Sequence, residues 1–255
     1  MPHSERHLEE AAARLAQARR VVVFSGAGAS KESGISTFRE PGEGLWARYD
    51  PMKLATREAY DADPAFVWRW YESRFGLIEA AEPNPGHYAV AELARSVPTV
   101  VVTQNIDGLH QRAGSSDVIE LHGSARRFKC LSERHTGLTR EDFAGIDEAP
   151  PRCPHCGDLI RPDVVWFGEA LPADALQRAL DEAADCDLVI AVGTTGVVYP
   201  AAMVPVMAQQ TGAAVIDVNP DEDAIATFAD WWLRGPGGEV LPRLVALALE
   251  LRGRD

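Results

Sequence analysis

The chain lacks any apolar run long enough to cross a bilayer, which takes about 20 consecutive apolar residues. Its first six residues also lack the apolar core of a secretory signal peptide. We therefore expect a cytoplasmic protein that makes no contact with a membrane. Cysteine is scarce as well, with four in the chain, and a reducing compartment should keep them as thiols.

Positive charge is the second shortage. Lysine and arginine number 25 against 38 aspartates and glutamates, which gives a formal net charge of −13. A nucleic-acid-binding surface needs clustered lysine and arginine, so we expect no nucleic-acid partner. The acidic excess suits a protein that meets basic, lysine-bearing partners, and it would equally serve solubility alone.

Apolar runs and helical patterns alternate along the 255 residues. The apolar runs predict strands at residues 21–24, 97–102, 187–192 and 213–218. Helical patterns occupy residues 7–20, 85–96 and 172–184. This alternation is typical of an α/β fold, a Rossmann-like parallel sheet with helices on both faces.

Two stretches break the alternation and predict a smaller second module. Residues 40–85 are rich in Trp, Tyr and Pro and look helical, and residues 128–160 hold three of the four cysteines. We interpret the first as a helical insertion and the second as a zinc-ribbon-like insertion. The Rossmann-like domain then consists of residues 1–39, 86–127 and 161–255.

A glycine loop at residues 25–30, Ser-Gly-Ala-Gly-Ala-Ser, follows the first predicted strand at once. A strand that runs into such a turn exposes backbone N–H groups and lets a phosphate approach closely. The fingerprint of hydride-transferring dehydrogenases is absent, because Lys31 stands where its third glycine would be needed. The loop therefore predicts a dinucleotide site of another kind.

Polar side chains gather after the second predicted strand. Residues 103–110 are Thr-Gln-Asn-Ile-Asp-Gly-Leu-His, and His122 and Gly123 follow further on. Ligands of open α/β sheets bind at the carboxyl ends of the strands, so these residues and the glycine loop predict one site. Imidazole suits a general base near neutral pH. His122 is our candidate, and His110 is the weaker one, with an expected structural role.

The cysteines form only half of a recognisable metal site. Residues 153–157 are a C-x-x-C knuckle, but Glu133 stands where a second C-x-x-C would need cysteine. Three interpretations stay open: a structural zinc with one further ligand, weak zinc binding, or a module that folds without metal. The candidate ligands are Cys130, Cys153 and Cys156, with Glu133, His135 or His155 as the fourth.

Six segments occur along the chain in a fixed order. They are residues 26–30 (Gly-Ala-Gly-Ala-Ser), 33–39 (Ser-Gly-Ile, then Phe-Arg), 103–110, 121–123 (Leu-His-Gly), 164–169 (Val-Val-Trp-Phe-Gly-Glu) and 193–195 (Gly-Thr-Thr). With them the chain resembles a sirtuin, an NAD-dependent protein-lysine deacylase. The resemblance implies NAD as co-substrate, acylated-lysine proteins or peptides as substrates, and an active site between the two modules.

The resemblance also implies roles for individual residues. Cleavage of the nicotinamide–ribose bond develops oxocarbenium character, the acyl-lysine oxygen captures the ribose, and His122 activates a ribose hydroxyl. Asn105 orders water near the ribose, Gln104 faces it, and Asp107 contacts nicotinamide. The remaining NAD-binding residues implied are Gly26, Ala27, Gly28, Ser30, Phe38, Arg39, Gly193, Thr194, Thr195 and Asn219. The products would be nicotinamide, deacylated lysine and O-acyl-ADP-ribose.

Residues 164–168 are the candidate peptide-binding segment. An exposed strand edge offers backbone hydrogen bonds to an extended peptide without demanding a particular sequence. The alternative is an ordinary core strand, and the resemblance favours the peptide groove. The residues concerned are Val164, Val165, Trp166 and Phe167.

Tyr71 and Arg74 suggest which acyl group is removed. At a spacing of three they share one face of a helix, and a guanidinium beside a phenol suits a carboxylate. The pair matches the Tyr-x-x-Arg of desuccinylase-type (class III) sirtuins, as does Thr37 before Phe38. The resemblance thus implies removal of negatively charged acyl groups such as succinyl, with some deacetylation alongside.

Rival functions can be separated by their products. A mono-ADP-ribosyltransferase or NAD glycohydrolase shares the first bond cleavage but yields no acyl-ADP-ribose. A non-catalytic NAD sensor would bind NAD without turnover, which His122, Asn105 and Asp107 disfavour. The target proteins, the ranking of succinyl, malonyl and glutaryl groups, and the oligomeric state stay open at this stage.

Overall fold

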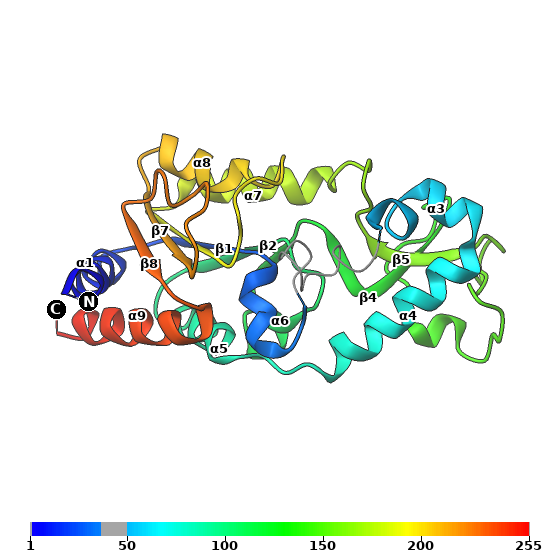
Figure 1. Ribbon diagram of the computed structural model, residues 1–255, viewed down its shortest axis with the longest axis horizontal. Helices are drawn as coiled ribbons and strands as arrows, with labels where there is room; N and C mark the ends of the chain where they lie inside the picture. The colour runs from blue at the N-terminus through cyan, green and yellow to red at the C-terminus, as the bar shows by residue number, and fades with distance from the viewer. Residues whose placement is uncertain (1, 37–49, 255) are drawn as a thin grey trace.

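The structure, a computed structural model, describes residues 2–36 and 50–254. Its larger domain is built on six parallel strands (Figure 1). In spatial order they are β3 (Val118–Glu120), β2 (Thr99–Thr103), β1 (Val21–Ser25), β6 (Leu188–Val192), β7 (Ala214–Asn219) and β8 (Trp231–Arg234). The four predicted strands are the four inner ones, which confirms their assignment.

Helices cover both faces of this sheet (Figure 1). On one face, Val21 and Val23 of β1 pack in a core with α1 (Pro2–Ala16), α5 (Pro85–Leu93) and α9 (Gly237–Arg252). On the other face, Val22 and Phe24 pack in a second core with α7 (Ala173–Asp185) and α8 (Met203–Gln210). Because alternate residues of β1 enter different cores, its first four residues, Val21 to Phe24, are all apolar. The predicted Rossmann-like architecture is confirmed.

The smaller module joins an antiparallel hairpin to two helices, α3 (Arg57–Ala62) and α4 (Pro64–Ala80) (Figure 1). The hairpin strands are β4 (Gly123–Cys130) and β5 (Ile160–Val164). Thr56 and Asp63 cap the two helices by accepting hydrogen bonds from backbone N–H groups of their first turns. Helices and hairpin share one aromatic core. The predicted domain boundaries at residues 127 and 161 therefore fall inside the two hairpin strands.

Short elements complete the described chain. They are η1 (Ala27–Ser33), η2 (Pro51–Lys53), α6 (Leu109–Ala113) and η3 (Arg140–Phe143). Among the described helices, none is both long and apolar enough to span a membrane.

The side-chain carboxyl group of Asp217, on β7, is buried within the larger domain. It is fully inaccessible to solvent, and neither oxygen has a hydrogen-bond partner among the described residues. Burial, followed by the nearby carboxylate of Asp223, raises the pKa of Asp217 to about 7. An aspartate in the unfolded chain ionises near pH ~3.9. The folded state therefore loses stability as pH rises from about 4 to about 7, because in this range only the unfolded chain releases the proton of this carboxyl group.

We expect Asp217→Asn to stabilise the protein at pH 8 and to change little near pH 4. The amide is neutral at every pH, so it removes a penalty of about 2–4 kcal/mol that the carboxyl group imposes above its folded pKa. Urea unfolding of both proteins at the two pH values measures this difference. An equal change at both pH values would mean that packing, rather than ionisation, decides the result.

Candidate active site

The order in which strands are added to the sheet reverses at its centre, between β1 and β6. From β1 the chain proceeds to β2 and β3 on one side, whereas β6, the other neighbour of β1, leads to β7 and β8. Loops that follow two such strands leave a crevice outside the carboxyl ends, where α/β proteins bind nucleotides. The predicted loops at residues 25–30 and 193–195 follow these two strands.

Glycines hold these two loops against each other. The N–H of Gly26 donates to the carbonyl of Val192 at 3.1 Å, and that of Gly28 to the carbonyl of Gly193 at 2.8 Å. A Cβ on Gly28 would lie 2.8 Å from the Cα of Gly193. The N–H of Ala27, the first residue of η1, has no partner among the described residues. Ala27 is therefore the backbone donor of this loop that an anion can use.

A buried polar cluster lies behind the glycine loop. The Asn105 side-chain amide donates to the Gly26 carbonyl at 2.9 Å and to the Ser30 hydroxyl at 3.0 Å, and that hydroxyl donates to Asp107 at 2.7 Å. Burial raises the pKa of Asp107, partly offset by hydrogen bonds from the Leu109 N–H and Ser30. Both amide hydrogens of Asn105 are used inside the protein, so its Oδ1 is the group that can accept from a ligand.

A second set of contacts joins three strand ends. Gln104, after β2, donates its side-chain N–H to the Thr194 hydroxyl at 2.8 Å. Asn219, the last residue of β7, donates to the Thr194 carbonyl at 3.0 Å and to Asp223 at 2.7 Å. Thr195 is exposed beside them. The structure thus brings together the predicted residues of β2, β6 and β7.

His122 lies half-buried in the turn before β4. Its Nδ1 is 2.8 Å from the carbonyl oxygen of Gln104. A carbonyl can only accept, so Nδ1 carries the hydrogen and the lone pair of the neutral ring is on Nε2. His110, in contrast, is buried against the Ser25 hydroxyl, and burial lowers its pKa to about 3. A neutral, enclosed imidazole agrees with the structural role expected of His110.

The candidate peptide-binding segment differs from a simple strand edge, because β5 ends at Val164. The next three N–H groups bond inside the protein: Val165 to the His122 carbonyl, Trp166 to the Glu169 carboxylate and Phe167 to the Ala55 carbonyl. The Trp166 carbonyl already accepts the Glu169 N–H, so an extended peptide beside these residues would pair with the carbonyl oxygens of Val165 and Phe167. Trp166 is only 2% exposed and packs into the core, whereas Phe167 is 41% exposed. Of these two side chains, Phe167 alone can line a groove.

Tyr71 and Arg74 lie one turn apart on α4, as predicted. Tyr71 is 6% exposed, and its hydroxyl accepts a hydrogen bond from Trp166 Nε1 at 2.9 Å. Burial raises the pKa of Tyr71, so the phenol keeps its proton. The guanidinium of Arg74 lies 5.9 Å from the centre of the Trp70 ring. Two other predicted site residues, Phe38 and Arg39, lie outside the described residues.

The cysteine cluster gains its fourth member from histidine. The ligand atoms of Cys130, His135, Cys153 and Cys156 all lie within 4.8 Å of one another. His135 Nδ1 is 3.8 Å from Sγ of Cys130 and 3.6 Å from Sγ of Cys153. Tetrahedral zinc with normal bond lengths places sulfur and nitrogen about 3.6 Å apart, so this set fits zinc.

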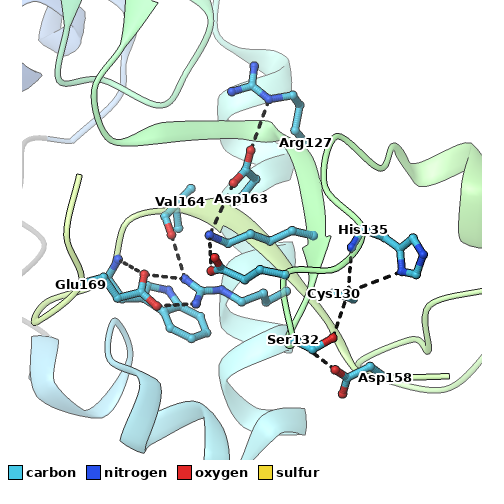
Figure 2. Close-up of polar contacts among 12 residues, drawn as sticks. Arg127, Cys130, Ser132, His135, Asp158, Asp163, Val164 and Glu169 are labelled. Carbon is cyan, nitrogen blue, oxygen red and sulfur yellow. Dashed lines mark hydrogen bonds and ion pairs between the residues drawn. The ribbon is translucent and has the colours of Figure 1, made fainter. Parts of the chain in front are cut away.

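Of the three candidates for the fourth zinc ligand, the geometry selects His135, which lies beside Cys130 at one end of the hairpin (Figure 2). Glu133 instead forms an ion pair with Lys129 at 2.7 Å. His155 stacks near the His135 ring, with 5.0 Å between ring centres, and is not part of the cluster. The sequence did not single out His135 because its spacing from Cys130 belongs to no C-x-x-C pattern.

Comparisons with known proteins agree with this geometry. Residues 26–200 match the Sir2 family. The chain is 53% identical over 232 residues to NAD-dependent protein deacylase 2 of Pyrobaculum aerophilum, covering 91% of this chain and 92% of the relative. It superposes on a Sir2 homologue–NAD complex with a TM-score of 0.88, at 44% identity over 96% of this chain and 94% of that one.

Another solved structure is a Sir2 protein bound to a myristoylated histone peptide. Its TM-score is 0.78 at 37% identity, covering 98% of this chain and 100% of that chain. The chain therefore belongs to the Sir2 family, as a bacterial-like member of the class III type, and is an NAD-dependent protein deacylase.

Proposed function

We propose that this enzyme removes succinyl-type, negatively charged acyl groups, and acetyl groups as well, from lysine side chains of proteins. NAD supplies the ADP-ribose that receives the acyl group, and nicotinamide leaves. His122 is the general base that activates a ribose hydroxyl. The observation that carries this role is the bond from His122 Nδ1 to the Gln104 carbonyl, which leaves the basic lone pair on Nε2.

The residues at the strand ends would hold NAD. The Ala27 N–H at the start of η1 suits a pyrophosphate oxygen. Asn105 Oδ1 suits a ribose hydroxyl or an ordered water, and Asn219 with Thr194 suits the adenosine side. Asp107 holds Ser30 and the first turn of α6 in place, which supports a positioning role in the nicotinamide region.

Arg74 and Tyr71 would bind the carboxylate at the end of a succinyl group. Arginine presents parallel N–H donors that match a carboxylate, and the protonated phenol adds a third donor. Both residues come from α4, which packs in the same core as Trp166 of the peptide-binding segment. The net charge of −13 would favour approach of basic, lysine-rich segments of substrate proteins.

Arg74→Met tests the proposed acyl preference. We expect kcat/KM for a succinyl-lysine peptide to fall about 10–100-fold, because a charge-assisted hydrogen bond contributes roughly 1.5–3 kcal/mol. A matched acetyl-lysine peptide should lose far less. Mass spectrometry of nicotinamide, peptide and O-acyl-ADP-ribose measures both reactions.

Arg69→Met on the exposed face of the same helix is the matched control for Arg74→Met, and it should change neither rate. Strong preference for acetyl peptide with no effect of Arg74→Met would make the chain a plain deacetylase. Consumption of NAD without acyl-ADP-ribose would favour an ADP-ribosyltransferase or a glycohydrolase.

A further inference from the structure

A buried arginine lies beneath the candidate peptide-binding segment. Arg161 of β5 is 1% exposed, and its two terminal nitrogens donate to the two oxygens of Glu169 at 2.5 and 2.9 Å (Figure 2). One of them also donates to the Val164 carbonyl at 2.9 Å. A buried charge is tolerated when it is paired and hydrogen-bonded in this way. Burial alone would raise the pKa of Glu169, but the hydrogen bonds from Arg161 and Trp166 lower it, so the carboxylate stays charged.

This ion pair closes the segment into a fixed loop. The Glu169 carboxylate accepts the Trp166 N–H at 2.9 Å, and the Glu169 N–H donates back to the Trp166 carbonyl at 3.0 Å. The guanidinium carbon of Arg161 also lies 3.3 Å from the centre of a Trp166 ring. The guanidinium thus packs against the indole, while the Glu169 bonds hold the backbone of the same tryptophan.

The indole in turn determines what the Tyr71 hydroxyl can do. Trp166 Nε1–H donates to the Tyr71 oxygen at 2.9 Å. An indole nitrogen can only donate, so Tyr71 is the acceptor in this bond and its own proton is available to another acceptor. The acyl carboxylate that Arg74 attracts would be such an acceptor.

We propose that Arg161 and Trp166 are positioning residues for acyl-group selectivity. Arg161 holds the indole, and the indole N–H directs the Tyr71 hydroxyl so that it donates to the carboxylate of the acyl group. Both side chains are almost fully buried and act through Tyr71 without touching the substrate. The inference rests on the proposed role of Tyr71 in binding that carboxylate.

Trp166→Phe tests the inference, because phenylalanine keeps an aromatic ring over Arg161 but has no N–H that could donate to Tyr71. We expect the ratio of kcat/KM for succinyl-lysine to that for acetyl-lysine to fall about fivefold to tenfold, as for loss of one hydrogen bond between neutral groups. The change should lie mainly in KM for the succinyl peptide, with KM for NAD unaffected.

Trp231→Phe is the matched control for the loss of an indole N–H. Its Nε1 donates to Glu10 at 3.4 Å at the opposite end of the molecule, so the acyl ratio should not change. Arg161→Lys keeps the charge but loses the planar fork, and it should lower the ratio in the same direction as Trp166→Phe. Thermal melting of each variant checks that it is folded.

Tyr71→Phe separates this inference from the proposed function. An unchanged acyl ratio in Tyr71→Phe would mean that Tyr71 does not bind the carboxylate. A lowered ratio in Tyr71→Phe but not in Trp166→Phe would overturn the positioning role alone. If the inference holds, the double variant lowers the ratio no further than Tyr71→Phe, because the indole acts through that hydroxyl. Additive losses would overturn it.

Discussion

Replacing His122 with alanine will abolish NAD-dependent removal of both succinyl and acetyl groups. General-base catalysis by a positioned imidazole contributes about 10²–10⁴-fold, so kcat should fall by at least that lower factor. The fold should survive, because His122 is half-buried in a turn and the substitution removes its hydrogen bond to the Gln104 carbonyl rather than core packing. Single-turnover assays that follow nicotinamide and O-acyl-ADP-ribose measure the loss.

His122→Asn distinguishes the base from a merely structural residue. Its amide can still donate to the Gln104 carbonyl, but it has no basic nitrogen. We expect it to be as inactive as His122→Ala, whereas His7→Ala on the exposed surface of α1 should keep full activity. An active asparagine variant would show that His122 only positions the loop after β2.

The inner strands could be predicted because burial on both faces leaves continuous apolar runs, as in Val21 to Phe24. The edge strands β3 and β8 have three and four residues and are not fully buried, so their patterns are too short to distinguish. Residues at strand ends could also be predicted as one site, since parallel strands all deliver their carboxyl ends to one edge of the sheet.

The contacts between loops could not be predicted in the same way. The N–H groups of Gly26 and Gly28 are used by carbonyls of Val192 and Gly193, which lie far along the chain. Whether a glycine faces a phosphate or a second loop depends on that tertiary contact. Trp166 illustrates the same limit, because only the packing of α4 against the hairpin decides that its side chain points into the core.

Loss of zinc should strongly lower the thermal stability of the protein. Replacing His135, the fourth member of the cluster, tests the site most directly. We expect the protein to carry about one zinc per chain and His135→Ala to lose most of it, because a structural site needs its fourth ligand. Binding energy at such sites is folding energy, so the melting temperature should fall by roughly 10 °C. Elemental mass spectrometry and thermal melting measure the two quantities. His155→Ala, which alters the neighbouring ring outside the cluster, should change neither.

Loss of zinc should also lower the activity, because the hairpin connects the metal site with the active site. Cys130 pairs with Ile160 at one end of the β4–β5 ladder, and Gly123 pairs with Val164 at the other, directly after His122. Loosening the metal end therefore weakens the strands that hold both the base and the peptide-binding segment. We expect the activity of His135→Ala to be lost at temperatures where the rest of the protein stays folded. A zinc-free wild type that melts at the same temperature as the zinc-loaded wild type would instead mean that the module folds without metal.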